Sequence, residues 1–334
     1  MKTPLQMLSE TSQSPAMQTV LKSITGIATS DLGILLVGEP GTGKEWIARK
    51  IHQMGSRSTG RFISVDCTSL PPGLVEQEIF GLEQFTPNGV TVDEGVLEDA
   101  EGGTVFLSGF SSLPLEVQMK VARAGAHQKF HRVGGRKELW YNGRTIVAVN
   151  QAPSENLPTG LLQKDILNRL SPIVIELPPL RKRREDLLAL LNLFISQTNE
   201  RYGATVRGIT PEALKICLTY TWPGNIRELR NMAEYAVIMA RNQLILPAHL
   251  PLQMQSTHLR NRLRGSFRKG KSVAAVEKYL ILEALRSSST KKEAAEQLGI
   301  SVRTLTNRLE QYDLDEELGN HHRVDEDDRT RSKR

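Results

Sequence analysis

The sequence predicts an α/β domain built on a mostly parallel sheet, followed by a helical lid and by a separate all-α domain. Up to about residue 180, short apolar runs alternate with longer amphipathic segments, a pattern typical of parallel sheets covered by helices on both faces. Beyond that point the strand-like runs stop while helical spacing continues. The chain has 334 residues, enough for about two domains of ordinary size.

Five short segments rich in β-branched residues are predicted to be the buried strands. Each is bounded by Gly, Pro or charged residues, and they lie at 34–37, 62–65, 104–107, 145–149 and 173–175. Helical segments lie between them. Helical spacing at 184–202 and 211–242, interrupted at 222–224, predicts the small helical lid.

Composition excludes several classes of protein. The chain is 39% hydrophobic and 24% charged, as in folded globular proteins, and no run approaches the ~18 apolar residues of a membrane span. The first twenty residues lack the features of a secretory signal. Two cysteines, Cys67 and Cys217, are too few for a disulfide scaffold or a Cys-rich zinc module. We therefore expect a cytoplasmic protein with reduced thiols, no membrane partner and no metal centre.

A phosphate-binding loop is predicted directly after the first strand. Residues 38–44 are GEPGTGK, which fits G-x-x-x-x-G-K between a strand and a helix. Backbone N–H groups of such a loop surround phosphate oxygens, the lysine adds a positive charge, and the helix N-terminus adds its dipole. The alternative is a glycine-rich turn without a ligand. The predicted site for ATP or ADP comprises Gly38, Glu39, Pro40, Gly41, Thr42, Gly43, Lys44 and Glu45.

Several ordered blocks resemble one family, the bacterial enhancer-binding proteins, whose AAA+ ATPase domains activate transcription by sigma-54 RNA polymerase. The blocks are GEPGTGKE, RFISVDCTSL, EQEIFG, EGGTVFL, LPLEVQ, FHRVGG, LPPLRKRREDL and WPGNIRELRN. The family usually has Glu at position 45, where other such loops carry a Ser or Thr for Mg²⁺, so Glu45 is explained by the resemblance. Mg²⁺ is nevertheless expected to be weakly held, because part of the family's metal site is lost after the strand at 104–107.

The resemblance implies a domain order for the chain. A flexible arm at 1–15 precedes an AAA+ α/β subdomain at 16–182 and a helical lid at 183–251. A basic linker at 252–271 then leads to a Fis-type helix-turn-helix domain at 272–314. The charged tail at 315–334 is expected to be disordered.

The first departure from the family pattern concerns hydrolysis. The family ends the strand at 104–107 with Asp-Glu, of which the Asp orients Mg²⁺ and the Glu activates the attacking water. Here the strand is followed by Ser108 and Gly109, and neither can act as a base. Glu98 and Asp99 precede the strand and are poor substitutes. General-base catalysis is worth ~10²–10⁴ in rate, so we expect impaired hydrolysis and assign no catalytic residue.

Two further departures concern the coupling of ATP hydrolysis to remodelling of sigma-54 polymerase. The family's GAFTGA loop, which touches sigma-54, is replaced after Gly81 by LEQFTPNGVTVDEG, in which Pro87 stiffens the turn. An arginine that the family supplies across the subunit interface is Gln163 here, although Arg169 remains. We therefore expect no remodelling of sigma-54 polymerase.

Two other nucleotide contacts are implied by the resemblance. Asn150 closes the strand at 145–149, where the family has a polar sensor of the γ-phosphate, and the alternative is an ordinary turn residue. Arg227 matches the lid arginine that reaches the nucleotide, and the alternative is a surface charge.

Residues 291–309 predict a helix-turn-helix. Gly299 permits a left-handed turn and Ser301 caps the second helix. Residues 252–314 contain twelve Lys or Arg and six Asp or Glu, which accounts for the net charge of +6 and favours double-stranded DNA as the partner. The alternative is a helical hairpin with a solvated basic face. The predicted core is Ala294, Ala295, Leu298, Ile300, Leu305 and Leu309. The candidate DNA contacts are Thr290, Lys292, Ser301, Arg303, Thr304, Thr306, Asn307 and Arg308.

The leading hypothesis is a sequence-specific DNA-binding transcription regulator that binds nucleotide but hydrolyses it poorly and does not remodel sigma-54 polymerase. The resemblance implies RNA polymerase, of a form left open, as a partner. It also implies a homodimer through the helix at 272–287, with a larger AAA+ ring as the alternative assembly. Two other functions stay open: a working sigma-54 activator ATPase with divergent motifs, and a scaffold for an intact activator. A steady-state ATPase assay separates the first two functions.

Overall fold

The structure is a computed structural model that describes residues 12–150 without 72 and 88, residue 170, residues 173–256, and residues 277–311 without 279, 280, 283, 286, 287 and 289. The chain divides into two compact units, Met1–Met254 and Gln255–Arg334. The block with Gln163, most of the helix predicted at 272–287 and the tail at 315–334 lie outside the described residues. No helix among the described residues is both long enough and apolar enough to cross a membrane.

The predicted five-stranded parallel sheet is confirmed in the first unit. Its order is β2-β5-β8-β1-β9, and all four neighbouring pairs are parallel. The carboxyl ends of all five strands therefore lie at the same edge of the sheet. The strands are β1 (Ile34–Gly38), β2 (Phe62–Asp66), β5 (Thr104–Ser108), β8 (Arg144–Asn150) and β9 (Ile173–Glu176).

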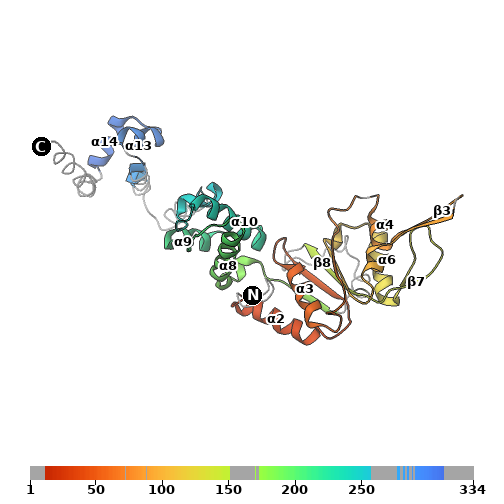
Figure 1. Cartoon of the computed structure of the whole chain (residues 1–334). Coiled ribbons are helices and arrows are strands. Elements are labelled where there is room, and N and C mark those ends of the chain that lie inside the picture. Colours follow the sequence, from red (N-terminus) through yellow and green to blue (C-terminus); the bar gives the residue numbers. More distant parts are fainter. Residues whose placement is uncertain are drawn as a thin grey trace. The chain divides into compact units, whose positions relative to one another are not determined.

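Helices cover both faces of this sheet, because the strand side chains alternate between two apolar cores. Ile34 and Leu36 of β1 pack with α2 (Pro15–Ile27) and α3 (Lys44–Met54). Leu35 and Val37 pack on the other face, which is covered by α4 (Val75–Phe80), α5 (Val96–Asp99) and α6 (Leu115–His127) (Figure 1). A short 3₁₀ turn, η1 (Phe110–Ser112), follows β5.

The start of α2 is fixed to a distant part of the same unit. Ser14 caps the helix, and the Asp186 carboxylate accepts hydrogen bonds from the backbone N of Gln13 at 2.6 Å and of Ser14 at 2.7 Å. The Ser14 hydroxyl also donates to Asp186, at 2.9 Å. The arm predicted to be flexible as far as residue 15 is therefore held by Asp186 at residues 13 and 14, while 1–11 lie outside the described residues.

Two antiparallel hairpins were not predicted: the segment after Gly81 was expected as a surface loop, and no strands were predicted at 129–140. β3 (Leu82–Thr86) pairs with β4 (Gly89–Asp93) and projects from the domain in Figure 1. β6 (Lys129–Phe130) pairs with β7 (Leu139–Trp140). Every residue of β4 is exposed. Val90 and Val92 do alternate with polar residues, but this pattern is short and no face of β4 is buried, so the sequence carried little sign of this hairpin.

The predicted lid is a helical bundle within the first unit. It comprises η2 (Leu180–Lys182), α8 (Glu185–Tyr202), α9 (Pro211–Thr219), α10 (Asn225–Ala240) and η3 (Pro247–His249). Trp222 is 1% exposed in its core, and its indole N–H donates to the carbonyl of Cys217. Both cysteines are free and buried.

The second unit contains the predicted helix-turn-helix. Its described helices are α13 (Lys291–Gln297) and α14 (Val302–Gln311), and Gly299 has a φ of +66° in the turn between them. Residues 277, 278, 281, 282, 284 and 285 of the preceding segment are also helical. The predicted core is confirmed, and Ile281 and Ala284 contribute to it as well.

Candidate functional site

The phosphate-binding loop connects β1 to α3 at the carboxyl edge of the sheet. Gly41 and Gly43 have φ values of +77° and +97°, in the left-handed region that glycine adopts without strain. Thr42 is 1% exposed, and its hydroxyl donates to the Glu39 carbonyl at 2.8 Å. Lys44 is the first residue of α3, so the positive end of the helix dipole lies at the loop. This geometry suits a bound phosphate.

The Lys44 ammonium is buried against its own loop. Nζ donates to the carbonyl oxygens of Gly38 at 2.7 Å and Glu39 at 2.9 Å. Burial, and then the nearby Arg227, lower the pKa of Lys44 to about 8. A phosphate group would give this ammonium an anionic partner, which the backbone carbonyls do not provide.

The lid is tied to the loop through Glu39. Both carboxylate oxygens of Glu39 accept hydrogen bonds from the Arg181 guanidinium, at 2.6 and 2.7 Å, and these bonds hold the pKa of Glu39 below its usual value. The Asn225 side-chain N–H₂ donates to the Pro40 carbonyl at 3.0 Å and to Glu39 at 3.2 Å. Its carbonyl oxygen accepts from the backbone N of Leu180 at 2.7 Å. Asn225 therefore connects the loop to two parts of the lid.

The start of α10 lies directly on the loop. A Cβ added at Gly41 would stand 2.2 Å from the carbonyl oxygen of Gly224 and 3.1 Å from Cβ of Arg227. The backbone N of Ile226 donates to the Gly41 carbonyl at 2.9 Å. The structure thus places Arg227 beside the predicted nucleotide site.

Arg183 is a second link between lid and loop that the sequence analysis missed. It is 2% exposed, and Nη2 donates to the Thr42 carbonyl at 2.7 Å. Burial lowers the pKa of Arg183 to about 10, and its Nε has no hydrogen-bond partner among the described residues. The only signal was a run of four basic residues, 181–184, which usually indicates a solvated surface.

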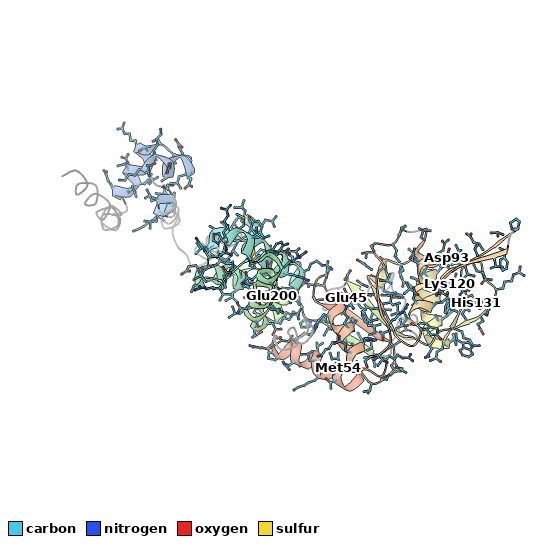
Figure 2. The ribbon with its side chains drawn as sticks, viewed as in Figure 1. Glu45, Met54, Asp93, Lys120, His131 and Glu200 are labelled. Atoms are coloured by element: carbon cyan, nitrogen blue, oxygen red, sulfur yellow. The ribbon has the colours of Figure 1, made fainter. Side chains whose placement is uncertain are left out.

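The remaining predicted nucleotide contacts differ in their placement. Asn150 ends β8 and is paired in register with Gly38, so it lies beside the first residue of the loop. Glu45 is exposed and pairs with Arg49 one turn along α3, at 2.7 Å. Figure 2 labels Glu45 and Met54 near the two ends of this helix.

The end of β5 carries no acid, and its geometry hinders the introduction of one. Gly109 has a φ of +66°, and a Cβ there would stand 2.6 Å from Cγ2 of Thr68. Among the described residues, no cluster of three or more His, Cys, Asp or Glu could hold a metal ion.

We expect Gly109→Ala to destabilise the first unit more than Gly102→Ala does. Gly102 has a similar φ of +69° but no atom within 4 Å of an added Cβ. Gly102→Ala therefore measures only the cost of placing alanine in a left-handed backbone conformation, about 1–2 kcal/mol. At Gly109 the overlap with Thr68 adds about 1–3 kcal/mol. Thermal unfolding of the full chain measures the difference.

Thr68→Ser removes Cγ2 and should rescue most of the extra loss at Gly109. Equal effects of the two alanine substitutions would contradict the steric account. For the same reason, an acidic pair introduced at 108–109 should not restore hydrolysis unless Thr68 is also changed.

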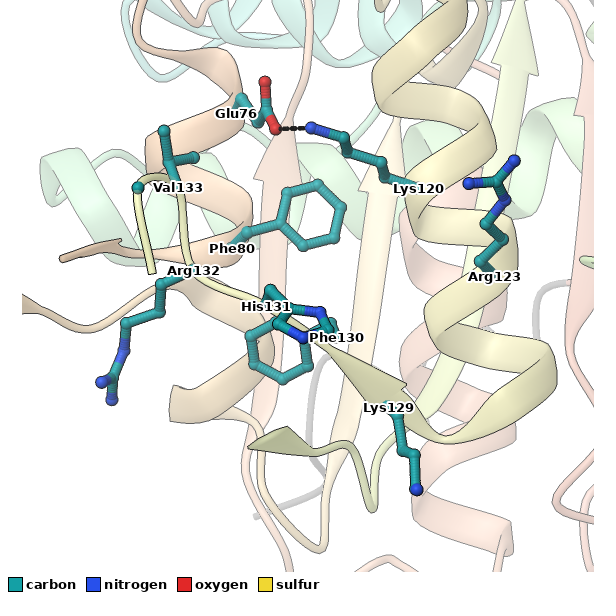
Figure 3. A pocket seen from close by; sticks show the side chains of 10 residues that line it. Glu76, Phe80, Lys120, Arg123, Lys129, Phe130, His131, Arg132 and Val133 are labelled. Atoms are coloured by element: carbon teal, nitrogen blue, oxygen red, sulfur yellow. Dashed lines mark hydrogen bonds and ion pairs between the residues drawn. The ribbon is translucent and has the colours of Figure 1, made fainter. Parts of the chain in front are cut away.

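A pocket of about 450 Å³ lies away from the loop, between α4, α6 and the segment at 129–134. Figure 3 shows Phe80 and Phe130 within it, and a Glu76–Lys120 ion pair beside them. Lys120 and His131 lie far from Glu45 in Figure 2. No residue of this pocket is among the candidate site residues predicted from the sequence.

In the helix-turn-helix, several candidate DNA contacts are used within the fold. The predicted cap is confirmed, because Ser301 Oγ accepts from the backbone N of Thr304 at 3.1 Å. Thr290 caps α13 in the same way, and the Thr306 hydroxyl donates to the Val302 carbonyl. Arg308 forms an ion pair with Glu277 at 3.0 Å.

Three of the candidate contacts have their side chains free for a ligand. Lys292, Arg303 and Asn307 are exposed and make no side-chain hydrogen bond or ion pair with the residues that the structure describes. Thr304 is also exposed, although its hydroxyl contacts Ser301 at 2.8 Å. Base or phosphate contacts are therefore best sought at these four positions.

Comparisons with known families cover most of the chain. The sigma-54 interaction domain matches residues 11–176, the AAA+ ATPase lid domain matches 181–265, and the bacterial regulatory protein Fis family matches 272–312.

Individual relatives match over the same span. The chain is 36% identical over 310 residues to the transcriptional regulatory protein ZraR of Klebsiella oxytoca, covering 92% of this chain and 70% of ZraR. It is 36% identical to the regulatory protein AtoC of Escherichia coli (strain K12), covering 90% of this chain and 67% of AtoC. Among solved structures, NtrX from Brucella abortus in complex with ADP is 30% identical with a TM-score of 0.68, covering 90% of this chain and 68% of that chain. The ATP complex of NtrX is 31% identical with a TM-score of 0.65, over 90% of this chain and 68% of that chain.

Proposed function

Because this chain belongs to the family of sigma-54-dependent transcriptional activators, with a Fis-type DNA-binding domain, we propose that it is a DNA-bound regulator that holds a nucleotide but hydrolyses it poorly. The observation that carries the proposal is the contrast at one edge of the sheet. The phosphate-binding loop at the end of β1 is intact, whereas β5 ends in Ser108 and Gly109. The groups that bind a nucleotide are kept, and the acids that split it are missing.

Nucleotide binding is supported by the loop geometry and by the relatives. Lys44, the two left-handed glycines and the start of α3 together form a site for phosphate. NtrX, which matches 90% of this chain, has been solved with ADP and with ATP. Asn150 and Arg227 are the further contacts that we assign to the nucleotide.

Impaired hydrolysis is inferred from what stands at 108 and 109. Neither a hydroxyl nor a hydrogen at these positions takes a proton from water at neutral pH, and neither adds negative charge to a Mg²⁺ site. We expect turnover to be lower by about 10²–10⁴ than with the acidic pair. Mg²⁺ would be held mainly by the phosphates of the nucleotide and by water.

Failure to remodel sigma-54 polymerase is inferred from the β3–β4 hairpin. The segment that replaces GAFTGA is a paired hairpin, with Phe85, Val90 and Val92 exposed on it. The Phe85-Thr86 pair of GAFTGA is kept, but the small residues that flank it in the family are replaced by Glu83, Gln84 and Pro87. The nucleotide would then act as a conformational ligand. It could shift the equilibrium between two conformational or oligomeric states of the protein only through its different affinity for them.

Lys44→Ala should weaken binding of a non-hydrolysable ATP analogue about 10- to 100-fold, because a charge-assisted hydrogen bond contributes about 1.5–3 kcal/mol. Binding by the unmodified protein should also weaken as the pH rises through about 8, where the Lys44 ammonium loses its proton beside Glu39 and Arg227. Isothermal titration calorimetry of the full chain measures both effects.

Lys50→Ala on the same helix is the matched control, since it removes the same charge away from the loop. A dissociation constant that is unchanged by Lys44→Ala would overturn the assignment of this loop to nucleotide. Turnover near the ~1 s⁻¹ of ordinary enzymes would instead overturn the impairment of hydrolysis.

A further inference from the structure

A carboxylate stands next to the position where the acidic pair is missing. Asp66 is the last residue of β2, and it is paired in register with Ser108, the last residue of β5. Because the strands are parallel, Asp66 lies at the same edge of the sheet as the phosphate-binding loop. Ligands of open parallel sheets bind at this carboxyl edge.

The Asp66 carboxylate lies near the space that a side chain on residue 109 would enter, next to the Thr68 side chain. Its Oδ1 lies 3.7 Å from the position that a Cβ on Gly109 would take. Gly109 has no side chain, so it leaves a carboxylate from the neighbouring strand beside that space.

Hydrogen bonds hold the Asp66 carboxylate in one orientation. Oδ1 accepts from the backbone N of Thr68 at 3.1 Å and from the Thr68 hydroxyl at 2.7 Å. Oδ2 accepts no hydrogen bond from any residue that the structure describes, and the residue is exposed. One oxygen therefore fixes the group, and the other is available to a water molecule.

The other carboxylates near this part of the domain are less suitable. Glu98 and Asp99 lie on α5, before β5, so the chain must cross the whole strand to reach the carboxyl edge. Glu98 is also paired with Arg132, and Glu39 with Arg181. Glu176 ends β9, on the other side of β1 from β5.

We propose that Asp66 positions the water that attacks ATP and accepts its proton, so that slow hydrolysis in this protein depends on Asp66; this rests on the proposed nucleotide site. In the step, the water oxygen forms a bond to the γ-phosphorus while the bond from that phosphorus to the β–γ bridging oxygen breaks. The bridging electron pair leaves with ADP. The water proton passes to Asp66 and then to solvent, which leaves ADP and inorganic phosphate.

The test compares Asp66→Asn with the unmodified full-length protein in single-turnover hydrolysis of ATP, with Mg²⁺ and excess protein. Asn removes the charge but still accepts the Thr68 hydrogen bonds through its side-chain carbonyl, so the local fold should be kept. We expect the hydrolysis rate to fall at least 10-fold, since general-base catalysis contributes ~10²–10⁴. The dissociation constant of a non-hydrolysable analogue should change less than 2-fold. Asp66→Glu, which keeps the charge, should retain more of the rate than Asp66→Asn.

Two controls make the result decisive. Glu176→Gln removes a carboxylate from the same edge and should leave the rate unchanged, and Lys44→Ala sets the background from contaminating ATPases. The proposal is overturned if Asp66→Asn hydrolyses ATP as fast as the unmodified protein, or if the unmodified protein does not exceed the background. The binding measurement separates these outcomes from failure of the nucleotide site, which would appear as loss of analogue binding by the unmodified protein.

Discussion

On a sigma-54 promoter with this protein as the sole activator, open complexes should stay at the background level even at saturating ATP. Remodelling requires both hydrolysis at a useful rate and a loop that transmits the change to the polymerase. The first requirement is weakened by Ser108 and Gly109 at the end of β5. The second is weakened because the β3–β4 hairpin keeps Phe85 and Thr86 but lacks the small residues that flank this pair in the GAFTGA loop of the family.

The experiment is permanganate footprinting of the promoter, with an intact member of the family as the positive control on the same template. A second reaction should contain both proteins, since a regulator that shares DNA sites with an intact activator would change the signal of that activator. ATP-dependent opening by this protein alone would contradict the proposal and would identify it as a working activator with divergent motifs.

The second large effect is expected when the helix-turn-helix is removed. A chain ending at residue 271 should lose sequence-specific DNA binding, that is, the factor of about 10³–10⁷ that separates specific from non-specific affinity. The reason is that α13 and α14 form the only helix-turn-helix among the described residues, and that α14 carries the exposed candidate contacts. Fluorescence anisotropy with specific and random duplexes measures this ratio, and ATP should not be required.

Point variants test the assignment of DNA binding to the helix-turn-helix without deleting the domain. Lys292→Ala and Arg303→Ala should weaken binding to all sequences, and each should reduce the salt slope by about one if its side chain binds a phosphate. Asn307→Ala should change sequence preference by about 1–3 kcal/mol if it contacts a base. Arg308→Ala is a less clean probe, because it also breaks the ion pair with Glu277. Specific binding by residues 1–271 alone would refute the assignment.

The sequence predicted the parts of this molecule whose signals are local. The five strands were found because they are short, apolar and bounded by Gly, Pro or charged residues. The expectation that all five are buried holds for β1 along its full length but not for β2, in which no residue is fully buried, because β2 lies at the edge of the sheet. The phosphate-binding loop was found because its glycines and Lys44 occur at fixed spacing between a strand and a helix. The turn at Gly299 and the cap at Ser301 were found for the same reason.

Contacts between distant residues were not predictable in this way. Arg181 and Glu39 are 142 residues apart, and Arg183 and Thr42 are 141 apart, so no spacing pattern relates them. Asp66 was part of a recognised block, but its position beside Ser108 depends on which strands are neighbours in the sheet. The strand order is set by packing of the whole domain, which periodicity does not encode.

The hydrogen bonds between Asp186 and residues 13 and 14 set an order on how this domain assembles as it is synthesised. The partners are 172 and 173 residues apart, so the N-terminal segment leaves the ribosome long before the first turn of α8 exists. Domains generally fold as units, with the N-terminal ones folding first during synthesis. Ser14 can cap α2 locally, but the hydrogen bonds that fix the start of this helix to Asp186 can form only after the lid has begun to form. Completion of the nucleotide-binding domain therefore waits for the start of the lid.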